Sequence, residues 1–283
     1  MNDSSTTIDA TRVPRLLYGT AWKEDSTEEL VARAIASGFR GIDTANQRKH
    51  YHEAAVGRAV TRAIERGDVS RSELFLQTKC TFRAGQDERL PYDPGAPIAT
   101  QVEQSLTSSL AHLGADFVDS YVLHAPSQRR GLGAADLEAR RAMEEAVDSG
   151  RVRLLGVSNV GPEQLIELCD VARIPPRFVQ NRCFARDGWD RRIRGLCVDR
   201  GIVYQGFSLL TANPAVLADS SVVDLAESYG RSAAQIVFWF ALDVGMLPLT
   251  GTSDERHMRE DLGILDFRLT PDEIERVEAA AER

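Results

Sequence analysis

The stretch GIDTANQRKHYHEAAVG, residues 41–57, decides the fold because its hydrophobic pattern changes from that of a strand to that of a helix. It opens with a short apolar run that ends in Asp43. A charged loop with a single tyrosine, Tyr51, follows, and the stretch closes with the helical pattern HEAAVG. A strand that leads through a loop into a helix is the repeating unit of an α/β protein. The fold therefore depends on how often this unit recurs along the chain.

The same unit recurs over nearly the whole sequence. Helical patterns such as TEELVARAIASG and SAAQIVFWFALDVG separate eight short apolar runs, and several of these patterns end in glycine. The runs predicted as strands are residues 16–21, 41–45, 74–79, 117–125, 152–159, 178–184, 202–210 and 246–251. Near-continuous apolar strands that alternate with helices indicate a parallel sheet covered by helices.

The number of units separates two α/β architectures. Eight units in about 250 residues is the count and size of a (β/α)8 TIM barrel, whereas a doubly wound sheet more often stops at about five to seven strands. The doubly wound fold also carries a glycine-rich fingerprint after its first strand, and the stretch GTAWKEDS has none. We therefore predict an α/β protein in which residues 1–283 form one (β/α)8 TIM barrel domain with a short N-terminal extension.

Composition and charge narrow the class of protein. The chain has 283 residues, 43% of them hydrophobic and 27% charged, as is typical of a globular protein. A net charge of -8 with scattered basic residues argues against a nucleic-acid partner, and neither a signal peptide nor a membrane span is apparent. The four cysteines and five histidines form no zinc-like cluster. We expect a cytoplasmic monomer or weak homo-oligomer with no metal, membrane or nucleic-acid partner.

Polar residues stand at the ends of the predicted strands, where a barrel builds its active site. Asp43, Lys79 and His124 end three consecutive strands, and Tyr51 lies in the loop between the first two. Each of these residues has an ordinary structural explanation, such as a cap, a lysine at the rim or a histidine in the core. Together they supply the parts of a site that donates a proton.

The segments around these residues carry a family resemblance. The segments GTAW, GIDTA, HEAAVG, LFLQTK, DSYVLHAP, GRVRLLGVSN, FVQNRCF, GFSLL and PLTGTSDERHMREDL follow one another in this order. In this order the chain resembles the aldo-keto reductase superfamily over nearly its whole length. The resemblance implies a (β/α)8 barrel that binds NADPH without a Rossmann fold and reduces aldehydes and ketones. It also implies a catalytic tetrad, which falls on Asp43, Tyr51, Lys79 and His124.

The chemistry of carbonyl reduction fits these four residue types. A phenol with an unperturbed pKa of about 10 is a poor proton donor at neutral pH. A nearby ammonium, here that of Lys79, lowers the pKa of the phenol, and a carboxylate, here Asp43, keeps the lysine charged. A neutral His124 can orient the substrate carbonyl by a hydrogen bond. Tyr51 is then the expected proton donor.

The tyrosine is where this sequence departs from the family pattern. The usual spacing of five residues after the aspartate leads to Arg48. Counting back from Glu53, which matches the next helix of the family, the tyrosine position falls on His50. Tyr51 and His50 are therefore alternative proton donors. We favour Tyr51 because the charge of Lys79 favours ionisation of a phenol but depresses the pKa of an imidazolium.

The resemblance also implies where a cofactor binds. Ser158, Asn159 and Gln180 match positions that hydrogen-bond the nicotinamide carboxamide, and Phe207 stands where relatives stack an aromatic ring. The full set of expected cofactor-binding residues is Gly19, Thr20, Ser158, Asn159, Gln180, Phe207, Ser208, Leu209, Gly251, Thr252, Ser253, Arg256, His257 and Asp261.

The choice between NADPH and NADH is less marked in the sequence. Where relatives carry a Pro-Lys-Ser segment and a later arginine that grip the 2′-phosphate, this chain has Gly251, Thr252 and His257. Asp261 replaces a frequent asparagine near the adenine, and Arg256 lies one residue from the expected arginine. We expect NADPH, with NADH as the alternative.

Two functions follow from the sequence. The first is an NAD(P)H-dependent oxidoreductase that reduces an aldehyde or ketone group of a small molecule to an alcohol. The second is a non-catalytic NADP-binding regulatory protein on the same barrel, for which the displaced tyrosine would be the sign of a weakened site. Only one of the four tetrad positions is displaced, and this favours the enzyme.

Overall fold

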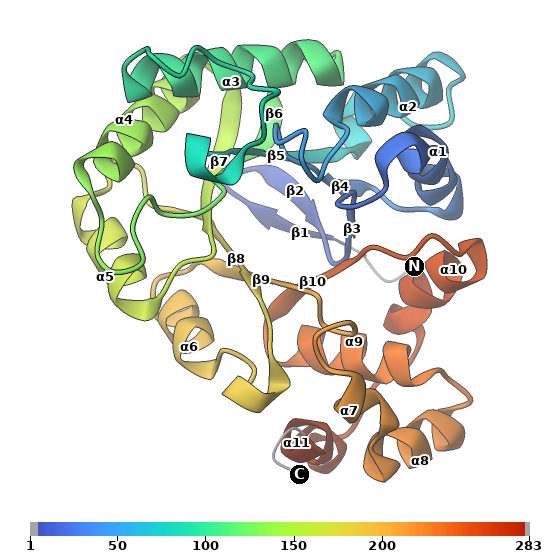
Figure 1. The fold of residues 1–283 in the computed structure, drawn as a ribbon. Coiled ribbons are helices and arrows are strands. Elements are labelled where there is room, and N and C mark those ends of the chain that lie inside the picture. Colours follow the sequence, from blue (N-terminus) through green and yellow to red (C-terminus); the bar gives the residue numbers. More distant parts are fainter. Residues whose placement is uncertain (1–4, 281–283) are drawn as a thin grey trace.

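The computed structural model describes residues 5–280, which form a closed barrel of eight parallel strands inside a ring of helices (Figure 1). All eight predicted strands are present, paired in the order β10-β3-β4-β5-β6-β7-β8-β9. The (β/α)8 barrel is therefore confirmed. The barrel strands are β3 (Leu17–Gly19), β4 (Gly41–Asp43), β5 (Phe75–Cys80), β6 (Val118–Leu123), β7 (Val152–Ser158), β8 (Phe178–Arg182), β9 (Val203–Phe207) and β10 (Met246–Thr250).

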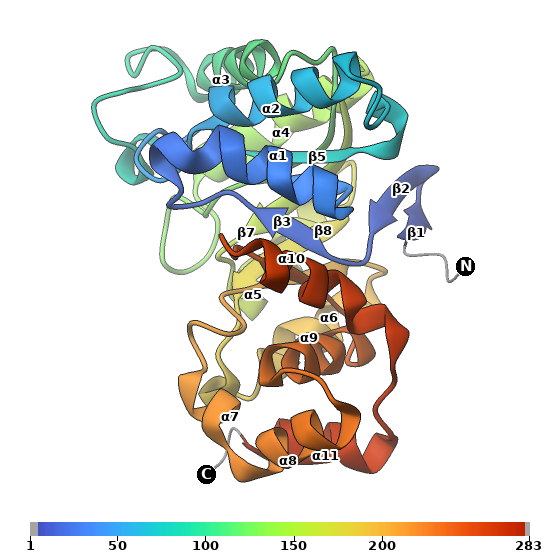
Figure 2. The same cartoon turned by 90° about the vertical axis from the view of Figure 1, so that its right-hand side faces the viewer.

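Helices connect the strands on the outside of the barrel. Those that follow the successive strands are α1 (Thr27–Ser37), α2 (Glu53–Glu65), α3 (Ile98–Leu113), α4 (Ala134–Asp148), α5 (Pro162–Val171), α6 (Arg191–Asp199), α9 (Ala233–Asp243) and α10 (Glu255–Leu262). Between β9 and α9 lie α7 (Pro214–Ala218) and α8 (Ser220–Tyr229), and α11 (Pro271–Ala279) packs against α8 and α9 (Figure 2). Short 3-10 helices are η1 (Glu24–Ser26), η2 (Arg71–Glu73), η3 (Arg83–Gly85), η4 (Ala185–Asp187) and η5 (Gly263–Asp266).

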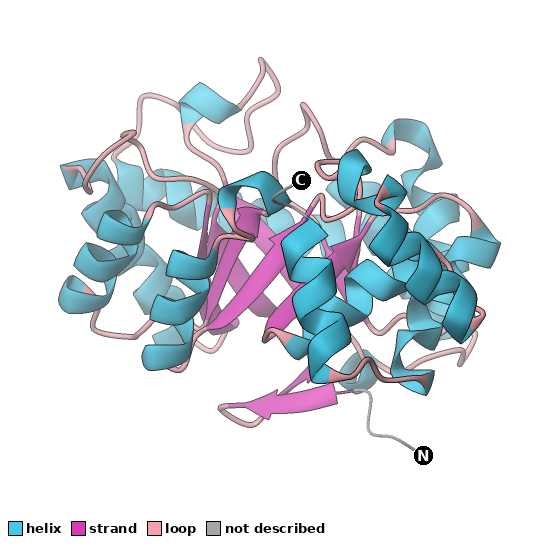
Figure 3. Cartoon of the chain, turned by 90° about the horizontal axis from the view of Figure 1, so that it is seen from below, coloured by secondary structure: helices cyan, strands magenta, loops and turns pink. Residues whose placement is uncertain are grey.

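The N-terminal extension forms an antiparallel hairpin that the sequence analysis does not predict. Its strands are β1 (Ser5–Ile8) and β2 (Thr11–Pro14), and it lies at one end of the barrel (Figure 3). The two turn residues, Asp9 and Ala10, have φ angles of 45° and 64°, as the tight turns of hairpins require. Val13 is fully buried against the amino ends of the barrel strands. The hairpin therefore closes this end of the barrel.

The barrel interior is apolar at the closed end and polar at the other. Val13 joins an apolar cluster with Leu17, Phe75 and Phe178. Because side chains two residues apart on a strand share a face, the next inward positions on β5 and β8 are Gln77 and Gln180. The polar residues thus lie one layer above an apolar base, at the carboxyl ends of the strands.

Two helix starts that share one sequence pattern differ in the structure. Thr270 caps α11 by accepting a hydrogen bond from the backbone N–H of Glu273, in the reciprocal arrangement that the pattern Thr-x-x-Glu predicts. Ser26, in the pattern Ser-x-x-Glu, makes no such bond to α1. The cause is η1, which precedes α1 and places Ser26 in a helical conformation, with φ -78° and ψ -4°. A cap residue needs a non-helical backbone.

Helix α2 approaches α3 closely at a glycine. A Cβ atom at Gly57 would overlap the backbone carbonyl of His112, near the end of α3. Glu53, at the start of α2, is buried and accepts hydrogen bonds from Thr78 of β5 and from His112. These contacts fix the start of α2, and with it the loop that carries Tyr51.

We expect Gly57→Ala to lower the free energy of unfolding by about 1–3 kcal/mol, because a methyl group forces α2 away from α3. Gly195→Ala is the matched control, since Gly195 also lies within a helix but faces open space. There the same change should raise stability by about 0.5–1 kcal/mol, through the lower backbone entropy of alanine. Urea unfolding measures both. Equal effects of the two substitutions would contradict the close approach of the helices.

Candidate active site

Asp43 and Lys79 form a buried ion pair at the carboxyl ends of β4 and β5. The Lys79 ammonium donates to both carboxylate oxygens of Asp43 at 2.7 Å and to the backbone carbonyl of Thr44 at 2.8 Å. Lys79 is fully buried and Asp43 is 3% exposed. Burial by itself lowers the pKa of Lys79, but Asp43 and Tyr51 raise it by more, so the net pKa lies above its ordinary value. The lysine therefore stays charged, as its pairing with Asp43 predicts.

Tyr51 lies against this ion pair. Lys79 Nζ is 5.1 Å from the centre of the Tyr51 ring, so the ammonium lies against the phenol. The backbone N–H groups of His50 and Tyr51 both donate to the carbonyl of Gln47, which closes a turn before α2. His50 stacks on Trp22 instead, with ring centroids 3.9 Å apart. The turn takes up the extra residues of the loop and brings the tyrosine, rather than His50, to the lysine.

The pKa of the Tyr51 phenol differs from the expectation based on sequence. Burial raises it, the Lys79 ammonium lowers it, and the Asp43 carboxylate raises it again. The net pKa lies above the ordinary value, so the expected lowering is wrong. Its cause is the loss of water around the partly buried ring, which outweighs the nearby ammonium. The phenol therefore carries its proton throughout the neutral pH range.

His124 completes the group of four. Its ring meets that of Tyr51 edge to face, with centroids 5.9 Å apart and an interplanar angle of 69°. Its Nδ1 lies 2.7 Å from the hydroxyl of Thr81. Burial, and then the positive charge of Lys79, lower the pKa of His124 to about 3. The imidazole is therefore neutral, as expected, and all four residues predicted to be catalytic meet at one place.

Ser158 and Asn159 lie beside this group, at the end of β7. The Ser158 hydroxyl donates to the backbone carbonyl of Gln180 at 2.6 Å. Asn159 has a left-handed backbone, with φ 55°, and its side-chain amide donates to the carbonyl of His124 at 2.8 Å. These bonds hold the two polar side chains at the wall of a cavity that they line.

Gln180 belongs to a cluster of three buried glutamines, two of which the sequence analysis does not single out. Its amide nitrogen donates to Asp43 Oδ1 at 3.0 Å and to the side-chain oxygen of Gln205 at 2.9 Å. Gln77 donates to the same two oxygens, at 2.7 Å and 2.8 Å. The signal for both missed residues is their spacing, because Gln77 stands two residues before Lys79 and Gln205 two before Phe207, on the same strand faces.

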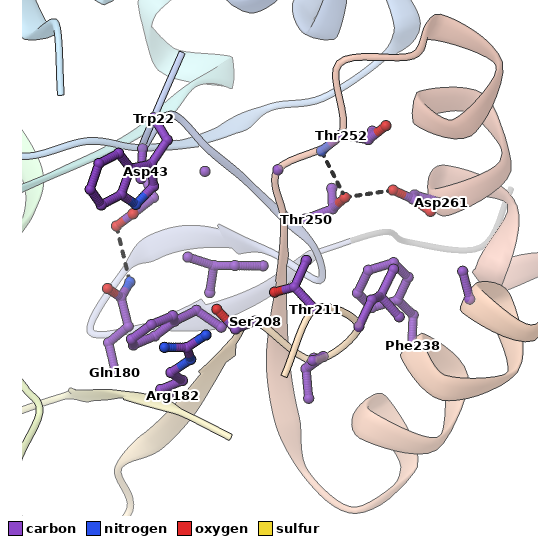
Figure 4. A pocket seen from close by; sticks show the side chains of 18 of the residues that line it. Trp22, Asp43, Gln180, Arg182, Ser208, Thr211, Phe238, Thr250, Thr252 and Asp261 are labelled. Carbon is purple, nitrogen blue, oxygen red and sulfur yellow. Dashed lines mark hydrogen bonds between the residues drawn. The ribbon is translucent and has the colours of Figure 1, made fainter. Parts of the chain in front are cut away.

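A cavity of about 670 Å³ opens above these residues. It extends from Trp22 and Asp43 to Phe238 of α9 and Asp261 of α10 (Figure 4). Most of the predicted site residues line it: Gly19, Asp43, Tyr51, His124, Ser158, Asn159, Gln180, Phe207, Ser208, Leu209, Gly251, Thr252, His257 and Asp261.

Four predicted site residues do not line the cavity. Lys79 lies behind Asp43 and Tyr51. Thr20 is fully buried, and its hydroxyl donates to the backbone carbonyl of Asp43 at 2.9 Å, so its role is to join β3 to β4. Ser253 and Arg256 are exposed, and Arg256 lies 3.5 Å from the Glu260 carboxylate.

The far end of the cavity, at α10, carries carboxylates. Asp261 accepts a hydrogen bond from the Thr250 hydroxyl at 2.6 Å, and burial raises its pKa to about 6 (Figure 4). Glu260 and His257 also line this end. Arg259 is exposed and pairs with Glu255 on the same helix.

The cavity is also lined by residues that the sequence analysis does not single out. Those from the connection after β9 and from the start and middle of α9 are Leu210, Thr211, Ser232, Ala234 and Phe238. The rule that a barrel builds its active site at the carboxyl ends of its strands does not extend to these residues. No spacing in the sequence therefore indicates that they line the cavity. Arg182 is the exception, since it follows Gln180 by two residues on β8 and so faces the same way.

Comparisons with known proteins agree with this fold. The sequence profile of the Aldo/keto reductase family matches residues 16–282. The chain is 30% identical over 253 residues to the uncharacterized oxidoreductase YtbE of Bacillus subtilis (strain 168), covering 89% of this chain and 82% of the relative. It is also 30% identical over 297 residues to deoxymugineic acid synthase 1 of Oryza sativa subsp. japonica, covering 96% and 87%.

A solved structure shares the fold. The crystal structure of an aldo/keto reductase from Brucella melitensis superposes with a TM-score of 0.81 over 98% of both chains, at 24% sequence identity. Barrel, site and sequence profile together define the class, and the chain belongs to the aldo/keto reductase family. Members of this family are generally NAD(P)H-dependent oxidoreductases that act on carbonyl groups.

Within residues 5–280, no group of three or more histidine, cysteine, aspartate or glutamate side chains is arranged to hold a metal ion. No helix in the same range is long and apolar enough to cross a membrane.

We expect the His124 ring to remain neutral from about pH 5 to about pH 8, because burial and Lys79 disfavour its charged form. Its ring-proton resonance should then keep one chemical shift across this range in an NMR titration. Comparison with the spectrum of His124→Gln assigns the signal. A midpoint for that signal inside the range would contradict the neutral imidazole.

Proposed function

We propose that residues 1–283 act as one barrel domain that reduces an aldehyde or ketone group of a small molecule to an alcohol, using NAD(P)H. The observation that carries this proposal is the position of the Tyr51 ring, which lies against the buried Lys79 ammonium and meets the neutral ring of His124 edge to face. A protonated phenol beside an ammonium and a neutral imidazole is suited to giving a proton to a carbonyl oxygen.

The cavity residues fit a nicotinamide dinucleotide. The side chains of Ser158, Asn159 and Gln180 offer hydrogen-bonding groups to a planar amide, and Phe207 offers a ring face for stacking. Ser208, with a left-handed φ of 57°, begins the turn that leads the backbone along the cavity wall. Bound there, the reduced nicotinamide supplies the hydride.

His124 positions the carbonyl group in this proposal. When the Thr81 hydroxyl donates to Nδ1 of the neutral ring, the Nε2–H is left as a donor for the carbonyl oxygen. A charged imidazolium beside Lys79 would add repulsion between like charges. The low pKa of His124 therefore serves its role as a neutral hydrogen-bond donor.

Tyr51 then gives its proton to the alkoxide oxygen. Its raised pKa keeps the phenol protonated before the reaction. Lys79 stabilises the phenolate left after transfer, and Asp43 holds the lysine in place and charged. The convergence of all four residues supports an enzyme over a non-catalytic NADP-binding regulator.

We expect Tyr51→Phe to lower kcat by about 10²–10⁴-fold, because it removes the proton donor and leaves the ring in place. Binding of the dinucleotide, followed by tryptophan fluorescence, should change little. His50→Gln is the matched control for the alternative donor and should retain most activity, since the His50 ring lies at the cavity wall, stacked on Trp22, and not against the Lys79 ammonium as Tyr51 does. Full activity in Tyr51→Phe, or its loss in His50→Gln, would move the proton donor away from Tyr51.

Charges at the far end of the cavity bear on the choice of dinucleotide. The resemblance to the family favours NADPH. At this end, however, Glu260 and Asp261 line the wall, while Arg256 and Arg259 lie outside it and pair with carboxylates. A carboxylate accepts a hydrogen bond from the ribose 2′-hydroxyl of NADH but repels the 2′-phosphate of NADPH. This arrangement supports NADH as the second candidate.

We expect Asp261→Asn at about pH 7.5 to lower the ratio of the Kd for NADPH to that for NADH by about three- to tenfold, as removal of one nearby negative charge would. In the unmodified protein the ratio should fall as the pH drops through about 6, where Asp261 takes up a proton. The part of the pH dependence that comes from Asp261 should be absent from Asp261→Asn. The variant also serves as a control for protonation of the 2′-phosphate itself, which is the same with both proteins. A ratio that the substitution leaves unchanged would show that Asp261 does not bear on the choice.

A further inference from the structure

Four side chains at the centre of the barrel form a closed ring of hydrogen bonds. Asp43 Oδ1 accepts from Gln77 at 2.7 Å and from Gln180 at 3.0 Å. The side-chain oxygen of Gln205 accepts from the same two amide groups, at 2.8 Å and 2.9 Å. Two oxygens and two NH₂ groups thus alternate around the ring. Its members come from β4, β5, β8 and β9, so the ring crosses the barrel interior.

The chemistry of the ring fixes the orientation of each amide. An ionised carboxylate only accepts hydrogen bonds, so Gln77 and Gln180 must turn their NH₂ groups toward Asp43. Each NH₂ group then uses its second hydrogen on Gln205. The NH₂ group of Gln205 donates in turn to the side-chain oxygen of Gln77, at 3.0 Å. A reversed Gln77 or Gln180 would bring two acceptor oxygens together.

Two members of the ring, Gln77 and Gln205, lie where water cannot replace a lost partner. Gln77 and Gln205 are fully buried, and Asp43 and Gln180 are each 3% exposed. Below the ring is the apolar base of the barrel, and above it is the ion pair with Lys79. Asp43 is therefore held by neutral donors on one side and by an ammonium on the other. Its position sets that of Lys79, and Lys79 in turn contacts Tyr51.

We propose that Gln77 and Gln205 are positioning residues for the proton-donating site: through this ring they hold the Asp43 carboxylate against Lys79 and fix the amide of Gln180. Neither touches the cavity, so neither is a catalytic residue. The expected effect of the two glutamines on turnover rests on the proposed reductase function. Their expected effect on stability rests on the ring alone.

The ring has a consequence for Gln180. Both hydrogens of its NH₂ group are used inside the barrel, on Asp43 and Gln205. Its side-chain oxygen is the part left for a ligand in the cavity that Gln180 lines. Gln180 therefore acts as an acceptor, matched to the NH₂ group of a carboxamide.

The first test replaces one amide of the ring by an acid. In Gln77→Glu, only the protonated acid can donate to Asp43, so activity should fall at least tenfold from about pH 5.5 to about pH 8. The unmodified enzyme and Gln101→Glu should lack this fall. Gln101 is a matched control because it is also buried and donates to a backbone carbonyl, that of Ala96, away from the cavity. Gln77→Met should lower kcat at every pH without a new pH dependence. Profiles of Gln77→Glu and the unmodified enzyme that coincide, or full kcat in Gln77→Met, would overturn the proposal.

The second test does not need turnover. In Gln77→Glu the folded protein must hold a proton that the unfolded chain releases, so the folding equilibrium constant should fall by up to about tenfold per pH unit above about pH 5. Adding Asp43→Asn restores a donor opposite the new acid. Urea unfolding of this exchanged pair should lose the extra pH dependence, although activity stays low.

The two tests separate failure of this proposal from failure of the proposed function. If the unmodified protein reduces no carbonyl compound, the reductase function fails, and the unfolding experiment still decides the role of the ring. If the stability of Gln77→Glu and that of the double variant with Asp43→Asn depend on pH in the same way, the proposed role of the ring is overturned.

Discussion

The upper half of the barrel interior depends on a lysine and an aspartate that are both buried. Removing an ammonium and a carboxylate from water costs a free energy comparable to the net stability of a domain, unless each charge finds partners. Lys79 is paired with Asp43 and with a backbone carbonyl, and Asp43 also accepts from Gln77 and Gln180. These partners occupy inward positions on their strands. The ion pair thus explains why this half of the barrel is polar.

The apolar base of the barrel strengthens these interactions. Val13 of the N-terminal hairpin closes the amino end of the barrel over Phe75 and Phe178, so the ion pair is not reached from that side. Hydrogen bonds and charge interactions are stronger where the surroundings are apolar. At the other end of the strands, burial raises the pKa of Tyr51 and lowers that of His124, so the phenol keeps its proton and the imidazole stays neutral.

The sequence predicts the parts of the fold and site that follow a repeating pattern. Strand-helix alternation predicts the barrel. The strand ends locate Asp43, Lys79 and His124, which are three of the four residues that meet at the candidate active site. It does not predict the hairpin, whose strands are short and partly polar, or the cavity wall formed by α9, to which no spacing rule applies. Gln77 and Gln205 carry a signal in their spacing, but a glutamine within a strand is also compatible with a solvent-facing position. The pKa of Tyr51 could not be predicted, because it depends on how deeply the ring is buried.

The displaced tyrosine shows why counting residues is not enough to locate a functional side chain. A loop with extra residues needs extra contacts to hold its end in one place, because each added residue adds conformational entropy. Here the neighbouring loop after β5 supplies them: the amide of Gln47 donates to the carbonyl of Gly85 at 2.6 Å, and Gln86 donates to that of Asn46 at 2.8 Å. These two bonds tie the first part of the loop to the loop after β5. The position of Tyr51 is thus set by contacts at both ends of the loop, and the number of residues between them is free to vary.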